Sequence, residues 1–513
     1  MSMSTDSQNK KSSNLFDKIL NGIEKGGNAL PSPSTLFAGF AIFTILISAA
    51  ANYLGVQAIH PVTNEVINVD SLASANGVQR IMREMVVNFT SFAPMGIVIV
   101  ALIGLGVAEG SGLISAVIRL FVLSAPRSML TMIIVFCGVI SNTASTVGYV
   151  LLVPLAGTVF LAVKRHPLAG LAAGYAGVAG GYSANILIGT IDPLLAGLSQ
   201  EAARIIEPSY LVKATANYYF LFVSTFLITI VGTLVTEKIV EPRLGNYSGE
   251  VEPEKVEKLT STEKRGLKFS LLSLVVIVII LLIGVLPKNG ILRGDDGSIL
   301  NSPLIDGVIS LIFLVATVLG AVYGFTVGKF KCDKDVIKSM ENSMKSIAAY
   351  IVLVFFASQF VSYFNWTNLG LIIAIKGANL LSNLGGGLIP LMIIFVIFSA
   401  LINLFMGSAS AKWALMAPIF VPMFMLLGYS PELIQAGFRI GDSVTNPISP
   451  MMSFFALIIV YFEKYDTKTG IGTIVSIMLP YSILFFIFWT TLLIVWLLLG
   501  LPLGPDSHLY FSM

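Results

Sequence analysis

Residues 388–413 read LIPLMIIFVIFSALINLFMGSASAKW, an apolar run without charge up to Phe405 that then gives way to small and hydroxyl-bearing residues. The run Leu388–Phe405 has the length and composition of a helix that crosses most of a bilayer. The segment Gly407–Ser410 predicts a break directly after that helix. Irregular backbone at membrane depth survives only where protein or a water-filled cavity supplies hydrogen-bond partners. This stretch therefore predicts a polytopic membrane protein with a polar site at an interrupted helix.

The composition of the whole chain agrees with a membrane protein. Of 513 residues, 55% are hydrophobic and only 12% are charged, whereas about 25% of the residues in soluble domains are charged. A net charge of +3 is too small to indicate nucleic-acid binding. The spacing of Cys137 and Cys332 suits neither a disulfide framework nor a zinc site. Because no G-x-x-x-x-G-K-[ST], G-x-S-x-G or H-E-x-x-H motif is present, neither ATP coupling nor an enzyme is indicated.

Further apolar runs recur along the chain, and each is long enough to predict a transmembrane helix. They are Thr35–Leu54, Thr215–Val235, Phe269–Leu286, Leu304–Val327, Ser346–Tyr363 and Thr473–Leu499. Two more apolar blocks, from about 92 to 188 and from about 408 to 462, are broken by Gly, Pro and Ser, and their division into helices stays open. The expected fold class is an all-α polytopic membrane protein.

Lysine and arginine cluster in alternate loops. The N-terminal tail, the segment 237–268 and the segment 329–345 are basic, whereas the loops near 70 and 295 carry few basic residues. Because cytoplasmic loops are enriched in Lys and Arg, the three basic segments are predicted to be cytoplasmic and the other two external. The tail is polar and shows no signal-peptide pattern, so the first apolar run is expected to remain as a membrane anchor.

These features divide the chain into five predicted parts. They are a cytoplasmic tail (1–33), a first membrane half (34–236), a cytoplasmic linker (237–268), a second membrane half (269–500) and a C-terminal tail (501–513).

An internal repeat relates the two halves. Pro154 and Pro167 recur as Pro418 and Pro431, each 264 residues later, and the same offset aligns Ala172 with Ala436 and Gly177 with Gly441. Segments interrupted by Gly and Pro at corresponding places in two halves indicate a transport site. The spacing leaves open whether the repeat is inverted.

Four polar breaks interrupt the apolar blocks: Ser141–Ser145, Gly180–Asn185, Gly407–Ser410 and Asp442–Pro447. They share hydroxyls, side-chain amides and freed backbone carbonyls, which are the oxygen ligands that transporters offer to monovalent cations. Close helix packing through small residues is the alternative for any single break. Their occurrence in two related pairs favours a substrate and cation site.

Charged residues add to this hypothesis, because Asp192, Lys412, Arg439 and Asp442 interrupt apolar sequence. A charge at the centre of a transmembrane helix costs about 2.5–3.5 kcal/mol and therefore faces a cavity or a partner. Arg439 and Asp442 are three residues apart, so they either pair with each other or bind an anionic substrate and a cation, respectively. Asp192 is alternatively a helix cap, and Trp413 is either an interfacial aromatic or a stacking platform for an aromatic substrate.

Seven longer motifs carry a family resemblance. They are GYVLLVP (148–154), RHPLAG (165–170), GGYSAN (180–185), DPLLAG (192–197), GSASAKW (407–413), GDSVTN (441–446) and ISPMMS (448–453). With these motifs in this order, the chain resembles the p-aminobenzoyl-glutamate transporter (AbgT) family over nearly its whole length. The resemblance implies a bowl-shaped homodimer in the bacterial inner membrane, with nine transmembrane helices and two re-entrant hairpins per subunit, near 128–165 and 388–428.

The resemblance also implies a function. Members of the family take up p-aminobenzoyl-glutamate, a folate breakdown product, or export sulfonamide antimetabolites, and an ion gradient drives them. Transport direction and the choice between sodium and protons stay open. A sodium-coupled dicarboxylate symporter is the alternative, a channel is a third class, and no cofactor is expected besides the coupling ion.

The resemblance assigns roles to particular residues. Asn403 and Asp442 are expected to bind sodium, with Ser183, Asn185 and Asn446 as further candidates. The residues expected to contact substrate are Ser141, Asn142, Thr143, Asp192, Ser410, Trp413, Pro431, Arg439 and Pro450. In this assignment the Arg439 guanidinium binds a carboxylate and the Trp413 ring faces the substrate ring.

Overall fold

A computed structural model of the chain describes residues 31–59, 64–144, 147–249, 251, 258–295, 297–299, 302–346, 348–383 and 387–511. The predicted tail 1–33 lies almost wholly outside these residues. The described part is built of helices, apart from one small antiparallel sheet of β1 (Gln57–Ile59) and β2 (Val66–Asn68).

The helices lie in two sets, one before residue 245 and one after residue 260, which are called the first and the second half. Those of the first half are α2 (Pro33–Tyr53), α3 (Ala75–Thr90), α4 (Ala93–Ser111), α5 (Leu113–Leu123), α6 (Leu130–Ser141), α7 (Val153–Ala162), α8 (Pro167–Tyr175), α9 (Ile191–Ala203), α10 (Tyr218–Val235) and α11 (Glu241–Leu244). Those of the second are α12 (Ser261–Val285), α13 (Pro303–Asp306), α14 (Val308–Val327), α15 (Asp333–Ser346), α16 (Ala348–Trp366), α17 (Leu369–Asn383), α18 (Leu388–Phe405), α19 (Ala409–Met425), α20 (Pro431–Thr445), α21 (Phe455–Glu463) and α22 (Ile471–Leu498). Short 3-10 or π segments are η1 (Arg127–Met129), η2 (Asn142–Ala144), η3 (Gly148–Leu152), η4 (Ala176–Gly180), η5 (Thr236–Val240) and η6 (Asn446–Ile448).

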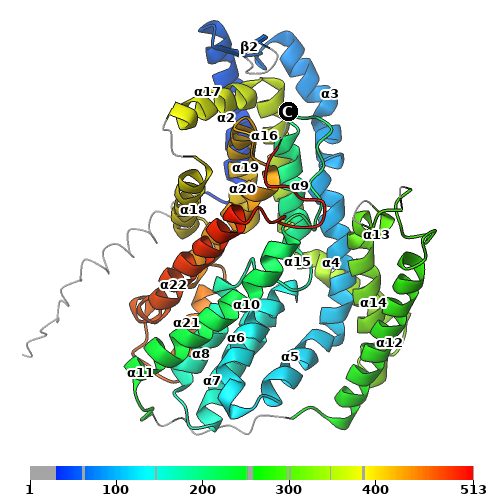
Figure 1. Cartoon of the computed structure of the whole chain (residues 1–513), viewed down its shortest axis with the longest axis vertical. Coiled ribbons are helices and arrows are strands. Elements are labelled where there is room, and N and C mark those ends of the chain that lie inside the picture. The colour runs from blue at the N-terminus through cyan, green and yellow to red at the C-terminus, as the bar shows by residue number, and fades with distance from the viewer. Residues whose placement is uncertain are drawn as a thin grey trace, which may run out of the picture.

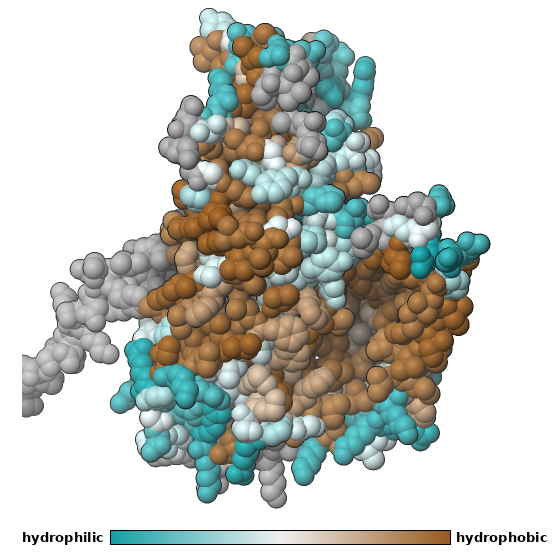
Figure 2. All heavy atoms as spheres, in the orientation of Figure 1, coloured by the Kyte–Doolittle hydropathy of each residue, from teal (hydrophilic) through white to brown (hydrophobic). Residues whose placement is uncertain are grey.

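Within the described residues, eight helices are long and apolar enough to cross a membrane. The number becomes nine if α5 and the segment Arg127–Ser141, which are bent by 115° at a short break, form one span. The prediction of an all-α protein with about nine transmembrane helices is therefore confirmed. The surface agrees with it, because the side chains of Phe226, Ile230, Leu272 and Ile283 are exposed on α10 and α12. Figure 2 shows this broad apolar flank, bounded by hydrophilic residues at the lower end of the molecule.

Two of the helices, α3 and α15, lie in segments that were predicted to be loops. The charged segment 329–345 was expected to be a loop, but residues 333–346 form α15, which packs along α4. Gly106 and Gly110 of α4 allow this approach, because a Cβ on either would collide with Ser343 or Ser339 of α15. Helix α3 falls in the predicted external loop near 70. Its Arg80 lies 4.3 Å from the centre of the Trp366 ring, a cation–π contact that accommodates the charge.

The linker between the halves is shorter than the predicted range 237–268. The chain remains helical from α10 through η5 and α11 to Leu244, and α12 begins at Ser261. Thr260 and Glu263 form a capping box that fixes this start.

The internal repeat is confirmed by matching contacts in the two halves. Asn142, at the end of α6, donates its Nδ2 hydrogen to the carbonyl oxygen of Val178 at 3.0 Å. Asn403, near the end of α18, donates in the same way to the carbonyl oxygen of Asp442 at 2.5 Å. The acceptors are 264 residues apart, as predicted, and the donors are 261 apart. The second copy therefore has three more residues than the first between the first arm of its hairpin and the helix that follows the hairpin.

Paired glycines support the same alignment. A Cβ on Gly441 would lie 2.6 Å from the carbonyl oxygen of Val396, and a Cβ on Gly177 would overlap that of Val135. The glycines are 264 residues apart and the valines 261. Each half thus packs the first arm of its hairpin against a glycine of the following helix.

The two hairpins, α6–α7 and α18–α19, approach each other from opposite ends of the molecule. Beyond α7, Arg165 Nη2 lies 2.5 Å from Glu241 Oε2 of α11. Beyond α19, the carbonyl oxygen of Gly428 accepts a hydrogen bond from the backbone of Phe511, near the C-terminus. Figure 1 shows α7 and α11 at the lower end, and α19 and the C-terminus in the upper part. The repeat is therefore inverted, with the hairpin tips near the middle.

Candidate functional site

The polar breaks of the two halves meet beside the C-terminal end of α20. The backbone N–H of Ser183 donates to Ser443 Oγ at 3.1 Å, and Asn446 Nδ2 donates to the carbonyl oxygen of Ala179 at 3.3 Å. Hydrogen bonds between the halves thus satisfy groups at the breaks, as irregular backbone at membrane depth requires. The convergence of these breaks agrees with a site shared by both halves.

A cavity of about 220 Å³ lies between the tip of the second hairpin and the end of α20. It is lined by Tyr149, Tyr182, Gly407, Ser408, Ala409, Ser410, Asp442, Asn446, Met452, Ser453 and Phe454. The rings of Tyr149 and Phe454 are stacked, with centroids 4.5 Å apart. The buried Tyr149 hydroxyl has no hydrogen-bond partner among the described residues. The cavity therefore combines aromatic faces, hydroxyl groups and one carboxylate.

Lys412, near the start of α19, places its ammonium group on the two residues predicted to bind sodium. Lys412 Nζ lies 2.5 Å from Asp442 Oδ1 and also donates to Asn403 Oδ1. The side chains of Lys412 and Asp442 are each 1% exposed. The amide group of Asn403 is held in place because its Nδ2 donates to the carbonyl oxygen of Asp442, to Thr445 Oγ1 and to Asn446 Oδ1.

The chemistry of these donors fits a monovalent cation, since carboxylate and amide oxygens are hard ligands. In this conformation, however, Asp442 Oδ1 and Asn403 Oδ1 both contact the Lys412 ammonium. A sodium ion cannot use the same two oxygens while the ammonium remains there.

The second buried ion pair joins the two halves. Arg439 Nη1, on α20, lies 2.7 Å from Asp192 Oδ1, on α9, and both side chains are almost fully buried. Asp192 Oδ2 also accepts a hydrogen bond from the backbone of Gly189 at 2.6 Å, as a residue near a helix start can do. The possible pairing of Arg439 with Asp442 is therefore wrong. Arg439 and Asp442 share a helix, but each forms an ion pair with an oppositely charged side chain of another helix.

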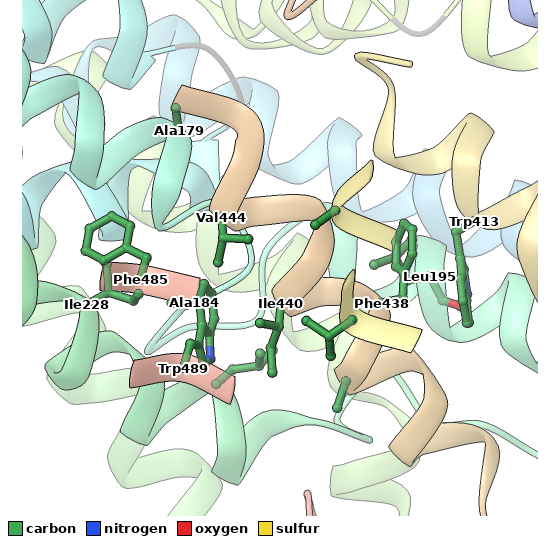
Figure 3. Close-up of a cluster of buried hydrophobic side chains, with 14 of the residues drawn as sticks. Ala179, Ala184, Leu195, Ile228, Trp413, Phe438, Ile440, Val444, Phe485 and Trp489 are labelled. Carbon is green, nitrogen blue, oxygen red and sulfur yellow. The ribbon is translucent and has the colours of Figure 1, made fainter. Parts of the chain in front are cut away.

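Trp413 lies inside the protein, fully buried. Its ring stacks on Phe438, with centroids 4.5 Å apart, and its Nε1 donates to Ser199 Oγ at 2.9 Å. Figure 3 shows Trp413 beside Phe438 and Leu195 in a cluster of apolar side chains. The interpretation of Trp413 as an interfacial aromatic is wrong, and in this conformation the ring does not line the 220 Å³ cavity.

Most of the other predicted residues belong to one of two groups. Ser410, Asp442 and Asn446 line the cavity. Several others belong to the tip of the first hairpin and its partner loop: Ser141, Asn142, Thr143, Ser183 and Asn185, with Thr143 Oγ1 donating to Asn185 Oδ1 at 3.2 Å. Ser145 of the predicted tip lies outside the described residues.

Two predicted prolines lie away from the cavity lining. Pro431 begins α20, at the opposite end of that helix from Asp442. Pro450 follows η6 and is partly buried.

The sequence-based reasoning missed the aromatic lining and left Lys412 without a role. Tyr149, Tyr182 and Phe454 all line the cavity, yet none was a predicted site residue. One signal was available for Tyr149, because it precedes Trp413 by 264 residues, the repeat offset.

Comparisons with known proteins agree with this geometry. A profile of the AbgT transporter family matches residues 18–511. The chain is 37% identical over 499 residues to the p-aminobenzoyl-glutamate transport protein of Escherichia coli K12, covering 97% of this chain and 98% of that protein.

Two solved structures are also similar. The YdaH transporter of Alcanivorax borkumensis is 45% identical, with a TM-score of 0.88, over 93% of this chain and 100% of that structure. MtrF of Neisseria gonorrhoeae, described as illuminating a class of antimetabolite efflux pumps, is 46% identical, with a TM-score of 0.90, over 95% and 100% of the two chains. With a family match over nearly its whole length and relatives of this similarity, the chain belongs to the AbgT family and is a multi-pass membrane transporter, not an enzyme.

Proposed function

We propose that this protein is an ion-gradient-driven secondary transporter of p-aminobenzoyl-glutamate and of sulfonamides that share its aniline-like end. The observation that carries this proposal is the 220 Å³ cavity at the hairpin tips, with its aromatic and hydroxyl-bearing lining. The 37% identical relative named as a p-aminobenzoyl-glutamate transport protein supports the substrate class. The relative described as an efflux pump supports export of antimetabolites.

The lining suits both ends of such a substrate. The stacked rings of Tyr149 and Phe454 offer an edge or face to an aromatic amide. Ser408, Ser410 and Ser453 can donate to carboxylate or sulfonyl oxygens. A plain dicarboxylate would leave the aromatic part of this lining unused, so the dicarboxylate alternative is less well supported.

We propose that Asn403 and Asp442 bind the coupling cation, sodium or a proton, in a state in which Lys412 has left them. Asn403 would supply an amide oxygen and Asp442 a formal negative charge to offset the dehydration of the ion. Arg439 would remain available to a substrate carboxylate, since its Nε makes no hydrogen bond within the described part of the chain.

The same proposal covers the membrane setting. The two hairpins would be re-entrant, the protein would form a bowl-shaped homodimer, and it would lie in a bacterial inner membrane. The basic linker between α11 and α12 would be cytoplasmic, together with the N-terminus.

Counterflow in proteoliposomes tests this function. Vesicles preloaded with unlabelled p-aminobenzoyl-glutamate should accumulate the labelled compound, and a sulfonamide should compete whereas succinate should not. Accumulation of succinate without competition by p-aminobenzoyl-glutamate would favour the dicarboxylate alternative. Repeating the assay with sodium replaced by potassium, with and without a pH gradient, identifies the coupling ion.

A further inference from the structure

We propose that Lys412 is a built-in cation that occupies the ion site in this conformation, and that sodium binds only when the Lys412 side chain is displaced. This inference rests on the proposed coupling through Asn403 and Asp442. It adds a residue with a defined function, because the lysine and the free ion would exclude each other from one position.

The geometry supports mutual exclusion. The ammonium is 2.5 Å from Asp442 Oδ1 and also contacts Asn403 Oδ1, so it touches one side-chain oxygen of each residue in the proposed ion site. The amide group of Asn403 is also fixed in this orientation, because its Nδ2 already donates to three acceptors. All three residues are almost completely buried, so water does not screen their charges.

The charges support it as well. Lys412 is the cation paired with Asp442, and the neighbouring Arg439 is paired with Asp192. With both pairs in place, the four buried charges sum to zero. A sodium ion added beside an unmoved Lys412 would leave one uncompensated positive charge in a site shielded from water, which is strongly unfavourable. Exchange of Lys412 for sodium preserves the balance at Asp442.

The inverted repeat provides an internal comparison. At the offset of 264, Gly148 corresponds to Lys412 and Val178 to Asp442. The positions also correspond in space, since a Cβ on Gly148 would lie 2.9 Å from the Val178 side chain. The first half keeps the asparagine, Asn142, but lacks both charges. The lysine and the aspartate are thus present together in one half and absent together in the other, as expected of a functional pair.

Displacement of Lys412 would also move the wall of the cavity. Lys412 belongs to α19, whereas Asn403 belongs to α18, and the non-helical residues 406–408 separate the two helices. Ser408 and Ser410, on the same tip as Lys412, line the cavity. Release of the ammonium would therefore free the tip of the second hairpin next to the proposed substrate position, which links ion exchange to access.

Sodium binding to purified protein tests this inference without a transport assay. The apparent affinity is measured with ²²Na⁺ and by thermal shift, at fixed pH, with potassium replacing sodium to keep the ionic strength constant. Lys412→Met should bind sodium at least about tenfold more tightly than the unmodified protein, because Asp442 is left as an unpaired buried anion. Lys412→Arg retains the positive charge and should not gain affinity. Lys412→Met/Asp442→Asn mimics the neutral first half and should fold but bind no sodium.

A measurement on the unmodified protein covers the case in which Lys412→Met does not fold. Saturating sodium, compared with potassium, should increase hydrogen–deuterium exchange in residues 406–412, because the ion pair that anchors the tip is lost. Unchanged sodium affinity in Lys412→Met, or unchanged exchange in the unmodified protein at saturating sodium, would overturn the inference. Failure of p-aminobenzoyl-glutamate counterflow would instead contradict the proposed substrate and leave these binding results interpretable.

Discussion

At the scale of single residues, two aromatic side chains related by the repeat have different surroundings. Tyr149 lines the cavity, and its hydroxyl has no hydrogen-bond partner in the described part of the chain, whereas Trp413 is enclosed and hydrogen-bonded to Ser199. The repeat therefore places an aromatic residue at the same position of each hairpin, but of these two only Tyr149 lines the cavity in this conformation. Recognition of an aromatic substrate is accordingly expected to depend on Tyr149 more than on Trp413.

Substitution of these two residues tests that expectation. Tyr149→Leu should weaken p-aminobenzoyl-glutamate binding about two- to tenfold, the equivalent of an aromatic contact of about 0.5–1.5 kcal/mol. Trp413→Phe keeps an aromatic ring but removes part of its buried volume and the Ser199 hydrogen bond, so it should cost at least about 1 kcal/mol of stability and leave affinity nearly unchanged. Equilibrium binding and thermal unfolding of the purified variants separate the two effects. A larger loss of affinity in Trp413→Phe than in Tyr149→Leu would show that the tryptophan contacts the substrate.

The partners of Arg439 can be tested by restoring charge balance. Arg439→Met should destabilise the protein by about 3–5 kcal/mol, because Asp192 becomes an unpaired buried charge. Adding Asp192→Asn should recover most of that loss. Adding Asp442→Asn instead should lower stability further, because Lys412 then loses its partner too. Recovery by Asp442→Asn but not by Asp192→Asn, measured by thermal unfolding, would contradict the pairing described here.

The sequence singled out the buried charged residues more successfully than it predicted their partners. Asp192, Lys412, Arg439 and Asp442 stood out because charges are rare in apolar segments. Spacing along one helix suggested the pair Arg439 and Asp442, since helical periodicity reports only local neighbours. The actual partners come from other helices, and their approach depends on how the two halves pack.

At the scale of helices, close packing at glycine determines where the hairpin arms lie. Gly441 lies against α18, and Gly177 occupies the equivalent place against α6. Small residues allow helices in a membrane to approach closely, with van der Waals contact as the main stabilising interaction. Asn403 belongs to α18 and Asp442 belongs to α20, the two helices that meet at Gly441. The position of Asn403 opposite Asp442 therefore depends on this contact.

A methyl group at Gly441 should therefore disturb the packing of α20 against α18, next to the proposed ion site. Gly441→Ala would bring Cβ within 2.6 Å of the carbonyl oxygen of Val396, and we expect a loss of about 1–3 kcal/mol in stability. Gly39→Ala in α2 is the matched control, because a Cβ there meets nothing within 4 Å and should be neutral or slightly stabilising. Thermal unfolding of both variants is the measurement. Equal stability of Gly441→Ala and Gly39→Ala would mean that the tight approach at Gly441 is not required.

Helix prediction from the sequence succeeded for long apolar runs and failed for amphipathic ones. Both ends of α18 and the C-terminal end of α14 agree with prediction, since lipid exposure demands a continuous apolar segment. Helices α3 and α15 carry charges that resemble those of a loop, and α15 is helical because it packs along α4. Such a helix depends on a tertiary partner, which local composition does not reveal.

At the scale of the whole molecule, the inverted repeat places equivalent hairpins at opposite ends with their tips close together (Figure 1). The two ion pairs are not equivalent in this arrangement. Arg439 and Asp192 join the two halves, whereas Lys412 and Asp442 both belong to the second half. One pair therefore holds the halves together, and the other lies within the half that lines most of the cavity.

The course of the chain through the membrane can be tested with the native cysteines. Cys332 is exposed after α14, Cys137 is buried, and Ile291, which is 86% exposed, precedes α14. Because α14 is long and apolar enough to cross the bilayer, positions 291 and 332 should lie on opposite sides. The basic residues around 332 predict that this side is cytoplasmic.

A membrane-impermeant maleimide should therefore label Ile291→Cys in a Cys332→Ser background in intact spheroplasts. The unmodified protein, with Cys332 as its exposed cysteine, should be labelled only in inside-out vesicles or after permeabilisation. The Cys332→Ser variant alone is the control for Cys137, which should react only after denaturation because its thiol is buried. Labelling of positions 291 and 332 from the same side would show that α14 does not cross the membrane. If position 332 is labelled from outside and position 291 from inside, α14 still crosses the membrane, but the proposed orientation of the protein is reversed.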